Sequence, residues 1–186
     1  MDSIQGRALV ASPYLNDPNF LRSVVYVLQH DEEGAFGLVL NRPTQATIGE
    51  LMEQLGETSV VNDANVYWGG PVDGPLMLLQ EAVSPSGDHA IFAASDQAKI
   101  LKICVGNEME EVGAGRYRIF DGYAGWGAEQ LNRELKSGDW LLWDVTPNHI
   151  FTEVDELWES AIKSIGRDVL AGGIDRSRIP EDPAFN

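Results

Sequence analysis

The segment spanning residues 23–44 constrains the fold more than any other part of the chain. Residues 23–29 and 35–40 are nearly continuous apolar runs rich in Val, Tyr and Phe, a pattern typical of strands covered on both faces. The acidic stretch 31–34 separates them, and its final Gly34 can adopt the positive φ that a tight turn requires. We therefore predict a central β-hairpin whose second strand ends abruptly at Asn41-Arg42-Pro43.

Shorter patterns predict strands and helices in alternation along the rest of the chain. Thr47 and Glu50 have the spacing of a capping box, so a helix begins there and ends at Gly56. Three further helices are expected over residues 96–105, 127–138 and 157–165, and further strands over residues 7–11, 65–68, 76–80, 90–94, 117–120 and 140–145. This order predicts one α+β domain over residues 1–171, with a mostly antiparallel sheet and four short helices. Residues 172–186 read as a tail.

Length and cysteine content agree with a single domain in a reducing compartment. A chain of 186 residues buries roughly 70% of its unfolded surface, which is enough for a core without cross-links. The single cysteine, Cys104, cannot form an internal disulfide. No apolar run approaches the roughly 18 residues of a membrane helix, and no export signal is visible at the N-terminus. We expect a cytoplasmic protein without a membrane-spanning segment.

The charge balance is strongly acidic, with 13 basic and 29 acidic residues giving a net charge of −16. Nucleic-acid binding depends on Lys and Arg that neutralise phosphates, so this charge argues against direct binding to DNA or RNA. High net charge also promotes solubility, whatever the function. A basic partner protein is the functional alternative.

Familiar catalytic and cofactor-binding patterns are absent from the sequence. The histidines His30, His89 and His149 are far apart and lack the spacing of common metal sites. There is no Gly-x-Ser-x-Gly motif, and Cys104 lies in an apolar helical segment, as a core thiol does. The Walker and Gly-x-Gly-x-x-Gly patterns are missing as well. We predict no metal, no cofactor and no catalytic residue.

Two bends carry most of the candidates for ligand binding. Arg42, preceded by Asn41, can hold a carboxylate or phosphate through two parallel hydrogen bonds, or it can pair with an acid of this chain. Gly69 and Gly70 can let backbone amides approach a ligand, although a tight turn needs the same residues.

A third bend and one histidine complete the set of candidates. Gly125 and Trp126 precede a predicted helix, and a helix N-terminus is a natural site for an anion. The glycines there can instead serve only to let the aromatic residues enter the core. His30 ends an apolar strand just before an acidic turn, where a carboxylate would favour its protonated form. A structural role for His30 is the alternative.

Several short motifs follow one another in a fixed order between residues 6 and 170. Besides the hairpin they are ALVASP from Ala8, DPNF from Asp17, YWGGPV from Tyr67, GYAGW from Gly122, WL from Trp140 and LW from Leu157. In this order they resemble the AlgH/YqgE family of bacterial proteins. The chain departs from the family pattern at Gln29, where Glu often precedes the histidine, and at Glu129, where Gly often precedes Gln-Leu.

The resemblance implies one compact mixed α/β domain with a bent, barrel-like sheet, and it implies no established activity. Family members are often labelled transcriptional regulators. Our first hypothesis is a non-enzymatic domain that binds a small anionic ligand or a protein partner, with regulation as one role for such binding. The alternatives are a hydrolase or transferase using His30 and Arg42, and a transcriptional regulator that acts through protein contacts. A DNA-binding helix-turn-helix with a basic recognition helix is not visible.

Overall fold

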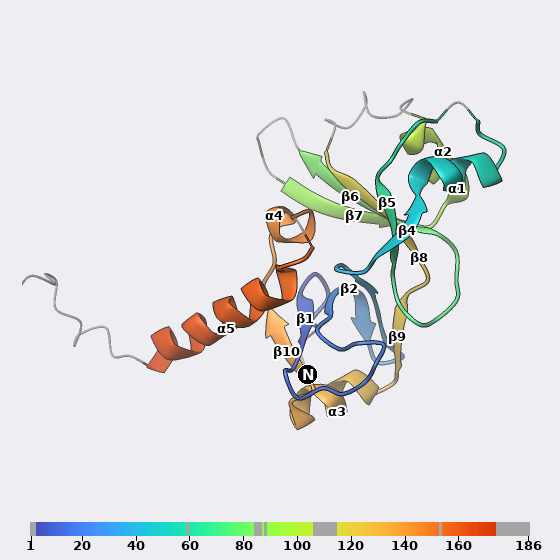
Figure 1. Ribbon diagram of the computed structural model, residues 1–186. Helices are drawn as coiled ribbons and strands as arrows, with labels where there is room; N and C mark the ends of the chain where they lie inside the picture. Colours follow the sequence, from blue (N-terminus) through green and yellow to red (C-terminus); the bar gives the residue numbers. More distant parts are fainter. Residues whose placement is uncertain are drawn as a thin grey trace, which may run out of the picture.

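The structure, a computed structural model, describes residues 3–58, 60–83, 87, 89–105, 115–152 and 154–173. Over these residues the chain forms two five-stranded sheets and five helices (Figure 1). The strands are β1 (Ala8–Ala11), β2 (Val24–Asp31), β3 (Gly34–Val39), β4 (Pro43–Thr47), β5 (Asn65–Trp68), β6 (Met77–Val83), β7 (His89–Ala94), β8 (Tyr117–Asp121), β9 (Ala124–Gly127) and β10 (Trp140–Trp143). The helices are α1 (Ile48–Gln54), α2 (Gln97–Cys104), α3 (Gln130–Ser137), α4 (Pro147–Ile150) and α5 (Leu157–Gly173).

The first sheet has the strand order β10-β1-β2-β3-β9, and every pairing in it is antiparallel. Its centre is the β2–β3 hairpin, which confirms the prediction made from the two apolar runs. Residues 8–11 and 24–25 are fully buried, because helices and the second sheet cover both faces. A β-bulge between Val27 and Gln29 shifts the register where β2 leaves the core.

The second sheet has the order β4-β5-β8-β6-β7 and includes one parallel pairing, between β5 and β8. Helices α1 and α2 cover one face of this sheet, and α3 and α5 pack on the first sheet (Figure 1). The predicted mixed α+β domain, with a sheet bent like half a barrel, is confirmed. The strands divide between two sheets, and the described residues form five helices rather than four.

Side chains of three buried clusters hold these layers together. One lies between the two sheets and α4 and α5, and includes Phe120, Leu79 and Ile150. A second joins the first sheet to α3 through Leu131. The third joins the second sheet to α1 and α2, and contains Cys104. Burial raises the pKa of the Cys104 thiol to about 11, so its nucleophilic thiolate is disfavoured at neutral pH.

Helix boundaries follow the predicted caps in some places and differ in others. The capping box of α1 is present, with the Thr47 hydroxyl accepting from Glu50 N and the Glu50 carboxylate accepting from Thr47 N. Helix α3 starts at Gln130, later than predicted, because residues 124–127 pair with β3 instead. Helix α5 does not end at Gly166 as predicted but continues to Gly173. A Cβ built on Gly166 would meet nothing within 4 Å, so no close contact requires a glycine there. Of the predicted tail, residues 174–186 lie outside the described residues.

Candidate functional site

An open cleft of about 390 Å³ lies where the β2–β3 turn meets β9. It combines an acidic rim with an aromatic floor. The lining residues are Gln29, Asp31, Glu33, Gly34, Ala35, Phe36, Val72, Tyr123, Gly125 and Trp126. Two of the residues selected from the sequence, Gly125 and Trp126, therefore share one site.

The register between β3 and β9 creates the floor of this cleft. Phe36 lies opposite Gly125 in the antiparallel pairing. Because Gly125 has no side chain, the space over it stays open, and a Cβ there would lie 3.3 Å from the Tyr123 ring. The rings of Phe36 and Tyr123 meet edge to face with centroids 6.0 Å apart. The cleft thus presents aromatic surface that is partly accessible to solvent.

The rim of the cleft carries carboxylates on the β2–β3 turn. Asp31 accepts a hydrogen bond of 2.5 Å from the Gln29 side-chain amide and one of 2.9 Å from Glu33 N. These bonds, with the Gln29 bond the larger cause, hold the pKa of Asp31 below its ordinary value. Asp31 and Glu33 are both exposed. The charged form of Asp31 is therefore the one presented at the cleft.

The indole N–H of Trp126 donates a hydrogen bond to a carboxylate of α3. Glu134 Oε2 accepts the indole N–H of Trp126 at 2.8 Å and that of Trp140 at 2.9 Å. Its other oxygen accepts from the Gln130 side chain at 2.9 Å, and Gln130 Oε1 accepts from Gly127 N at 3.1 Å. Phe20 stacks on Trp126, and Trp140 meets both of these rings edge-on. Trp126 is 6% exposed and its indole N–H is bonded inside the fold, so its side chain belongs to the core beneath the cleft.

Asn41 and Arg42 lie at the end of β3, and both side chains bond to backbone. Asn41 Oδ1 accepts from Val24 N at 3.0 Å, and its amide donates to Arg22 O at 2.9 Å. The Arg42 guanidinium donates to the carbonyl oxygens of Leu21 and Asn41. Partial burial lowers the pKa of Arg42 from its ordinary value. This bend closes the loop that enters β2 and does not line the cleft.

Gly69 and Gly70 lie beside the same bend and are buried under the segment after β8. Val39 N donates to Gly69 O at 2.9 Å, and Gly69 N donates to Asp121 O at 2.7 Å. A Cβ on Gly69 would lie 2.1 Å from Gly122 O, and one on Gly70 would lie 2.1 Å from the Tyr123 carbonyl carbon. The absence of side chains here lets two backbone segments touch.

The Nδ1 atom of each of the three histidines has a different partner. His30 Nδ1 accepts from Ile4 N at 3.3 Å, and His149 Nδ1 accepts from Thr146 N at 3.1 Å. His89 Nδ1 instead lies 2.6 Å from the Glu81 carboxylate, to which it can donate. Within the described part of the chain, no three His, Cys, Asp or Glu side chains are grouped to hold a metal ion.

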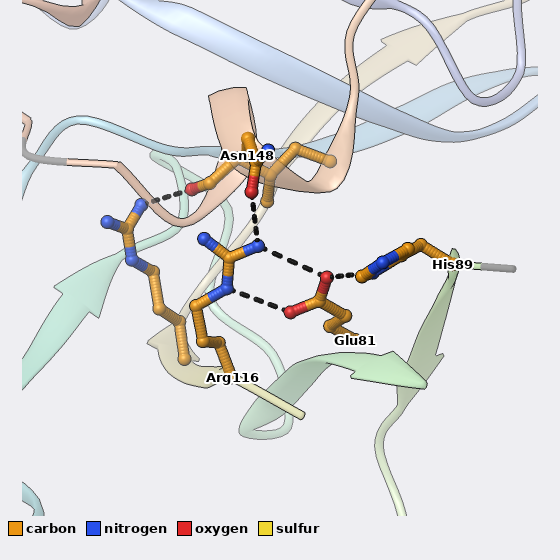
Figure 2. A network of polar contacts seen from close by, with 6 residues as sticks. Glu81, His89, Arg116 and Asn148 are labelled. Atoms are coloured by element: carbon orange, nitrogen blue, oxygen red, sulfur yellow. Dashed lines mark hydrogen bonds and ion pairs between the residues drawn. The ribbon is translucent and has the colours of Figure 1, made fainter. Parts of the chain in front are cut away.

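A polar network that sequence reasoning missed is centred on the buried Glu81 of β6, whose partners Arg116 and His89 are partly exposed. Figure 2 shows Arg116 and His89 both directed at the Glu81 carboxylate, with Asn148 of α4 bonded to Arg116. Arg116 donates from Nε to Oε2 at 2.8 Å and from Nη2 to Oε1 at 3.1 Å. Chiefly because of Arg116, the pKa of Glu81 falls to about 2. The Glu81 side chain is only 4% exposed, so the network ties α4 to the second sheet.

A second arginine makes a similar link within the core. Arg118 Nη1 donates to Ile150 O at 2.6 Å and to Leu40 O at 3.3 Å, and its guanidinium lies 4.6 Å from the Tyr67 ring centroid. It joins the second sheet to α4 and to the end of β3. Both arginines serve the fold.

A larger cavity of about 600 Å³ lies between α4 and α5 and includes Trp143 and His149. None of the residues selected from the sequence for ligand binding lines it. The β2–β3 cleft is lined by two of them, Gly125 and Trp126, and is therefore the candidate site. In the part of the chain that the structure describes, no helix is long and apolar enough to cross a membrane.

Comparison with known proteins identifies relatives over nearly the whole chain. A family model described as AlgH-like matches residues 8–170. A UPF0301 protein of Streptomyces coelicolor is 35% identical over 196 residues, which cover 100% of this chain and 97% of the relative. A UPF0301 protein of Vibrio parahaemolyticus is 35% identical over 178 residues, which cover 86% and 90% of the two chains.

Solved structures share the same fold. The solution structure of the AlgH protein from Pseudomonas aeruginosa has a TM-score of 0.68 and 30% identity, and the match covers 92% of this chain and 96% of that one. A crystal structure of a Corynebacterium diphtheriae protein also has a TM-score of 0.68, with 88% of each chain covered. At 20% identity, this second likeness concerns the fold alone.

Proposed function

This chain belongs to the AlgH-like family, and from that premise we propose that it is a non-catalytic protein whose β2–β3 cleft binds a basic segment of a partner protein. The observation that carries the proposal is the pairing of an acidic rim, Asp31 and Glu33, with the aromatic rings of Phe36 and Tyr123 in one cleft. Carboxylates and aromatic faces are the two groups that bind Arg and Lys side chains.

Electrostatics favour the same class of partner. A net charge of −16 attracts a positively charged segment at long range and speeds its association. At the cleft, a guanidinium can donate to Asp31 while it stacks on an aromatic ring, which contributes about 0.5–1 kcal/mol at an exposed site. A few such contacts give weak, reversible and salt-sensitive binding, as a regulatory role in the cytoplasm requires.

The other readings of the sequence have less support. A small anion at Arg42 would compete with the two carbonyl oxygens to which its guanidinium donates. A catalytic role for His30 with Arg42 would require the two side chains to converge, yet each bonds to a different backbone segment. A regulator that acts through protein contacts is a special case of the proposed function.

The proposal is tested by fluorescence anisotropy with labelled peptides of equal length, one Arg-rich, one Lys-rich and one Glu-rich. We expect the protein to bind the basic peptides and not the acidic one, with affinity that falls as salt is raised. The double variant Asp31→Asn/Glu33→Gln should weaken binding about 5- to 10-fold, which corresponds to about 1–1.4 kcal/mol. Tyr123→Leu should weaken the Arg-rich peptide more than the Lys-rich one, because guanidinium stacks on rings.

The matched control removes the same charge elsewhere on the surface. Glu53 of α1 and Asp63 in the connection between α1 and β5 are both exposed. The double variant Glu53→Gln/Asp63→Asn should leave peptide affinity nearly unchanged. An equal loss in both double variants would mean that net charge alone attracts the peptides, and the cleft proposal would be abandoned.

A further inference from the structure

Strand β7 is an edge of the second sheet, and within the described residues β6 is the strand that pairs with it. Its sequence is His89-Ala90-Ile91-Phe92-Ala93-Ala94, with no Asp, Glu, Lys, Arg or Pro. Phe92 is 54% exposed, and Ala90 and Ala93 are exposed as well. Soluble proteins usually protect such an edge with charges, prolines or bulges, because its free backbone groups can pair with another strand.

The hydrogen-bond pattern shows which backbone groups face outward. Glu81 N donates to Arg116 O, so the odd-numbered residues of β6 bond toward β8 and the even-numbered ones toward β7. Gln80 is opposite Phe92, and Ala82 is opposite Ala90, so these even-numbered residues of β7 bond to β6. The amide and carbonyl groups of His89, Ile91 and Ala93 therefore point away from the sheet.

We infer that β7 pairs antiparallel with β7 of a second copy of this chain, around a two-fold axis at Ile91. In that register Ile91 faces Ile91 of the partner subunit, and His89 faces the partner's Ala93. All three outward-facing residues then exchange both of their backbone hydrogen bonds, as an antiparallel ladder requires. The two second sheets become one continuous sheet with a symmetric interface.

The side chains of β7 are complementary to themselves in this register. Phe92 falls opposite the partner's Ala90, so a large ring lies beside a small side chain in both halves of the interface. The strand carries none of the 29 acidic residues, so it is an edge along which two chains of net charge −16 can approach closely. A basic peptide would find no carboxylate on this strand, which favours a second copy as the occupant.

The expected dimer is weak. Pairing through six residues buries less than the roughly 1,200–2,000 Å² of a standard interface, which places dissociation in the micromolar range or above. Raising the salt concentration screens the repulsion between the two acidic chains and should strengthen the dimer.

The decisive variant is Ala93→Pro. Proline lacks the N–H that would bond to the partner, and the N–H of residue 93 is not one that bonds to β6, so the fold should tolerate the change. Sedimentation velocity over a concentration series should show a concentration-dependent dimer for the wild type and a monomer for the variant. Phe92→Lys should raise the dimer dissociation constant at least about 10-fold, or about 1.4 kcal/mol. This second variant tests the inference if the proline variant fails to fold.

The control is Val61→Lys, which makes the same type of change at a residue 92% exposed in the connection before β5. It should dimerise like the wild type. Hydrogen exchange gives an independent readout, because the amides of Ile91 and Ala93 should gain protection as concentration rises. A wild type that stays monomeric, a proline variant that still dimerises, or full protection of Ile91 and Ala93 at high dilution would each overturn the inference.

Discussion

Glu134 of α3 should be essential to the stability of the first sheet because its carboxylate accepts from two buried indoles. Trp126 is 6% exposed and Trp140 is 3% exposed, and both donate to Glu134 Oε2 at 2.8–2.9 Å. Replacing Glu134 with Leu keeps much of the side-chain volume and removes both acceptors. Each indole N–H would then be buried without its carboxylate partner.

The expected loss of unfolding free energy follows from the number of indole N–H groups left without an acceptor. A buried donor left without its partner costs about 1–3 kcal/mol. Two donors give about 2–6 kcal/mol, and because Glu134 itself is only half-buried we expect about 2–4 kcal/mol for Glu134→Leu. In a chain of 186 residues this lowers Tm by roughly 5–15 °C, at about 2–4 °C per kcal/mol.

The assay is chemical denaturation of four proteins: the wild type, Glu134→Leu, Trp126→Phe/Trp140→Phe, and the triple variant. In the double-Phe background no indole N–H remains next to Glu134, so adding Glu134→Leu should cost less than about 1 kcal/mol. Glu53→Leu, at an exposed glutamate of α1, controls for the loss of one charge and should change stability by less than about 0.5 kcal/mol. The reasoning fails if Glu134→Leu costs as much in the double-Phe background as in the wild type.

Three further predictions address other parts of the fold. Arg116 and His89 hold the pKa of Glu81 at about 2, below its ordinary value of 4.5. The stabilisation from ionised Glu81 should therefore be complete above pH 4.5 and be lost as the pH falls toward 2. The difference in unfolding free energy between the wild type and Glu81→Gln should shrink to zero over that pH range. Glu129→Gly should raise stability by about 0.5–1 kcal/mol, because Glu129 has φ 59°, and Ala128→Gly should not. Gly125→Leu should fill the β2–β3 cleft next to Tyr123 and abolish peptide binding, with a circular-dichroism spectrum like that of the wild type.

Local patterns predicted the parts of the fold that depend on neighbouring residues. The hairpin was predicted from two apolar runs and a glycine turn, and α1 from the Thr47 and Glu50 capping box. Strands β4 and β9 were missed because they are short and polar or rich in glycine, and they become strands only by pairing with β5 and β3. The division into two sheets depends on the parallel pairing of β5 with β8, which lie about fifty residues apart and leave no local signal.

The Glu81 network could have been found in part. Glu81 stands inside the run Met77-Leu78-Leu79-Gln80-Glu81-Ala82-Val83, where a carboxylate in a buried strand requires a cationic partner. The strand predicted over residues 76–80 stops one residue before Glu81, whereas β6 continues to Val83. The sequence could not predict which cation pairs with Glu81, because Arg116 is 35 positions away along the chain. The family departure at Glu129 was visible, and the structure gives its meaning, a left-handed residue at the N-cap of α3.

The residues most conspicuous in the sequence make contacts that stabilise the fold. Asn41, Arg42 and His30 bond to backbone, and Gly69 and Gly70 let two segments touch. What remains open is an acidic cleft and a neutral strand edge, and the two respond to salt in opposite directions. Screening weakens attraction of a basic segment to the cleft and relieves repulsion between two copies at β7. If both proposals hold, rising salt must release the peptide while it promotes the dimer, and a common trend in one titration would exclude one of them.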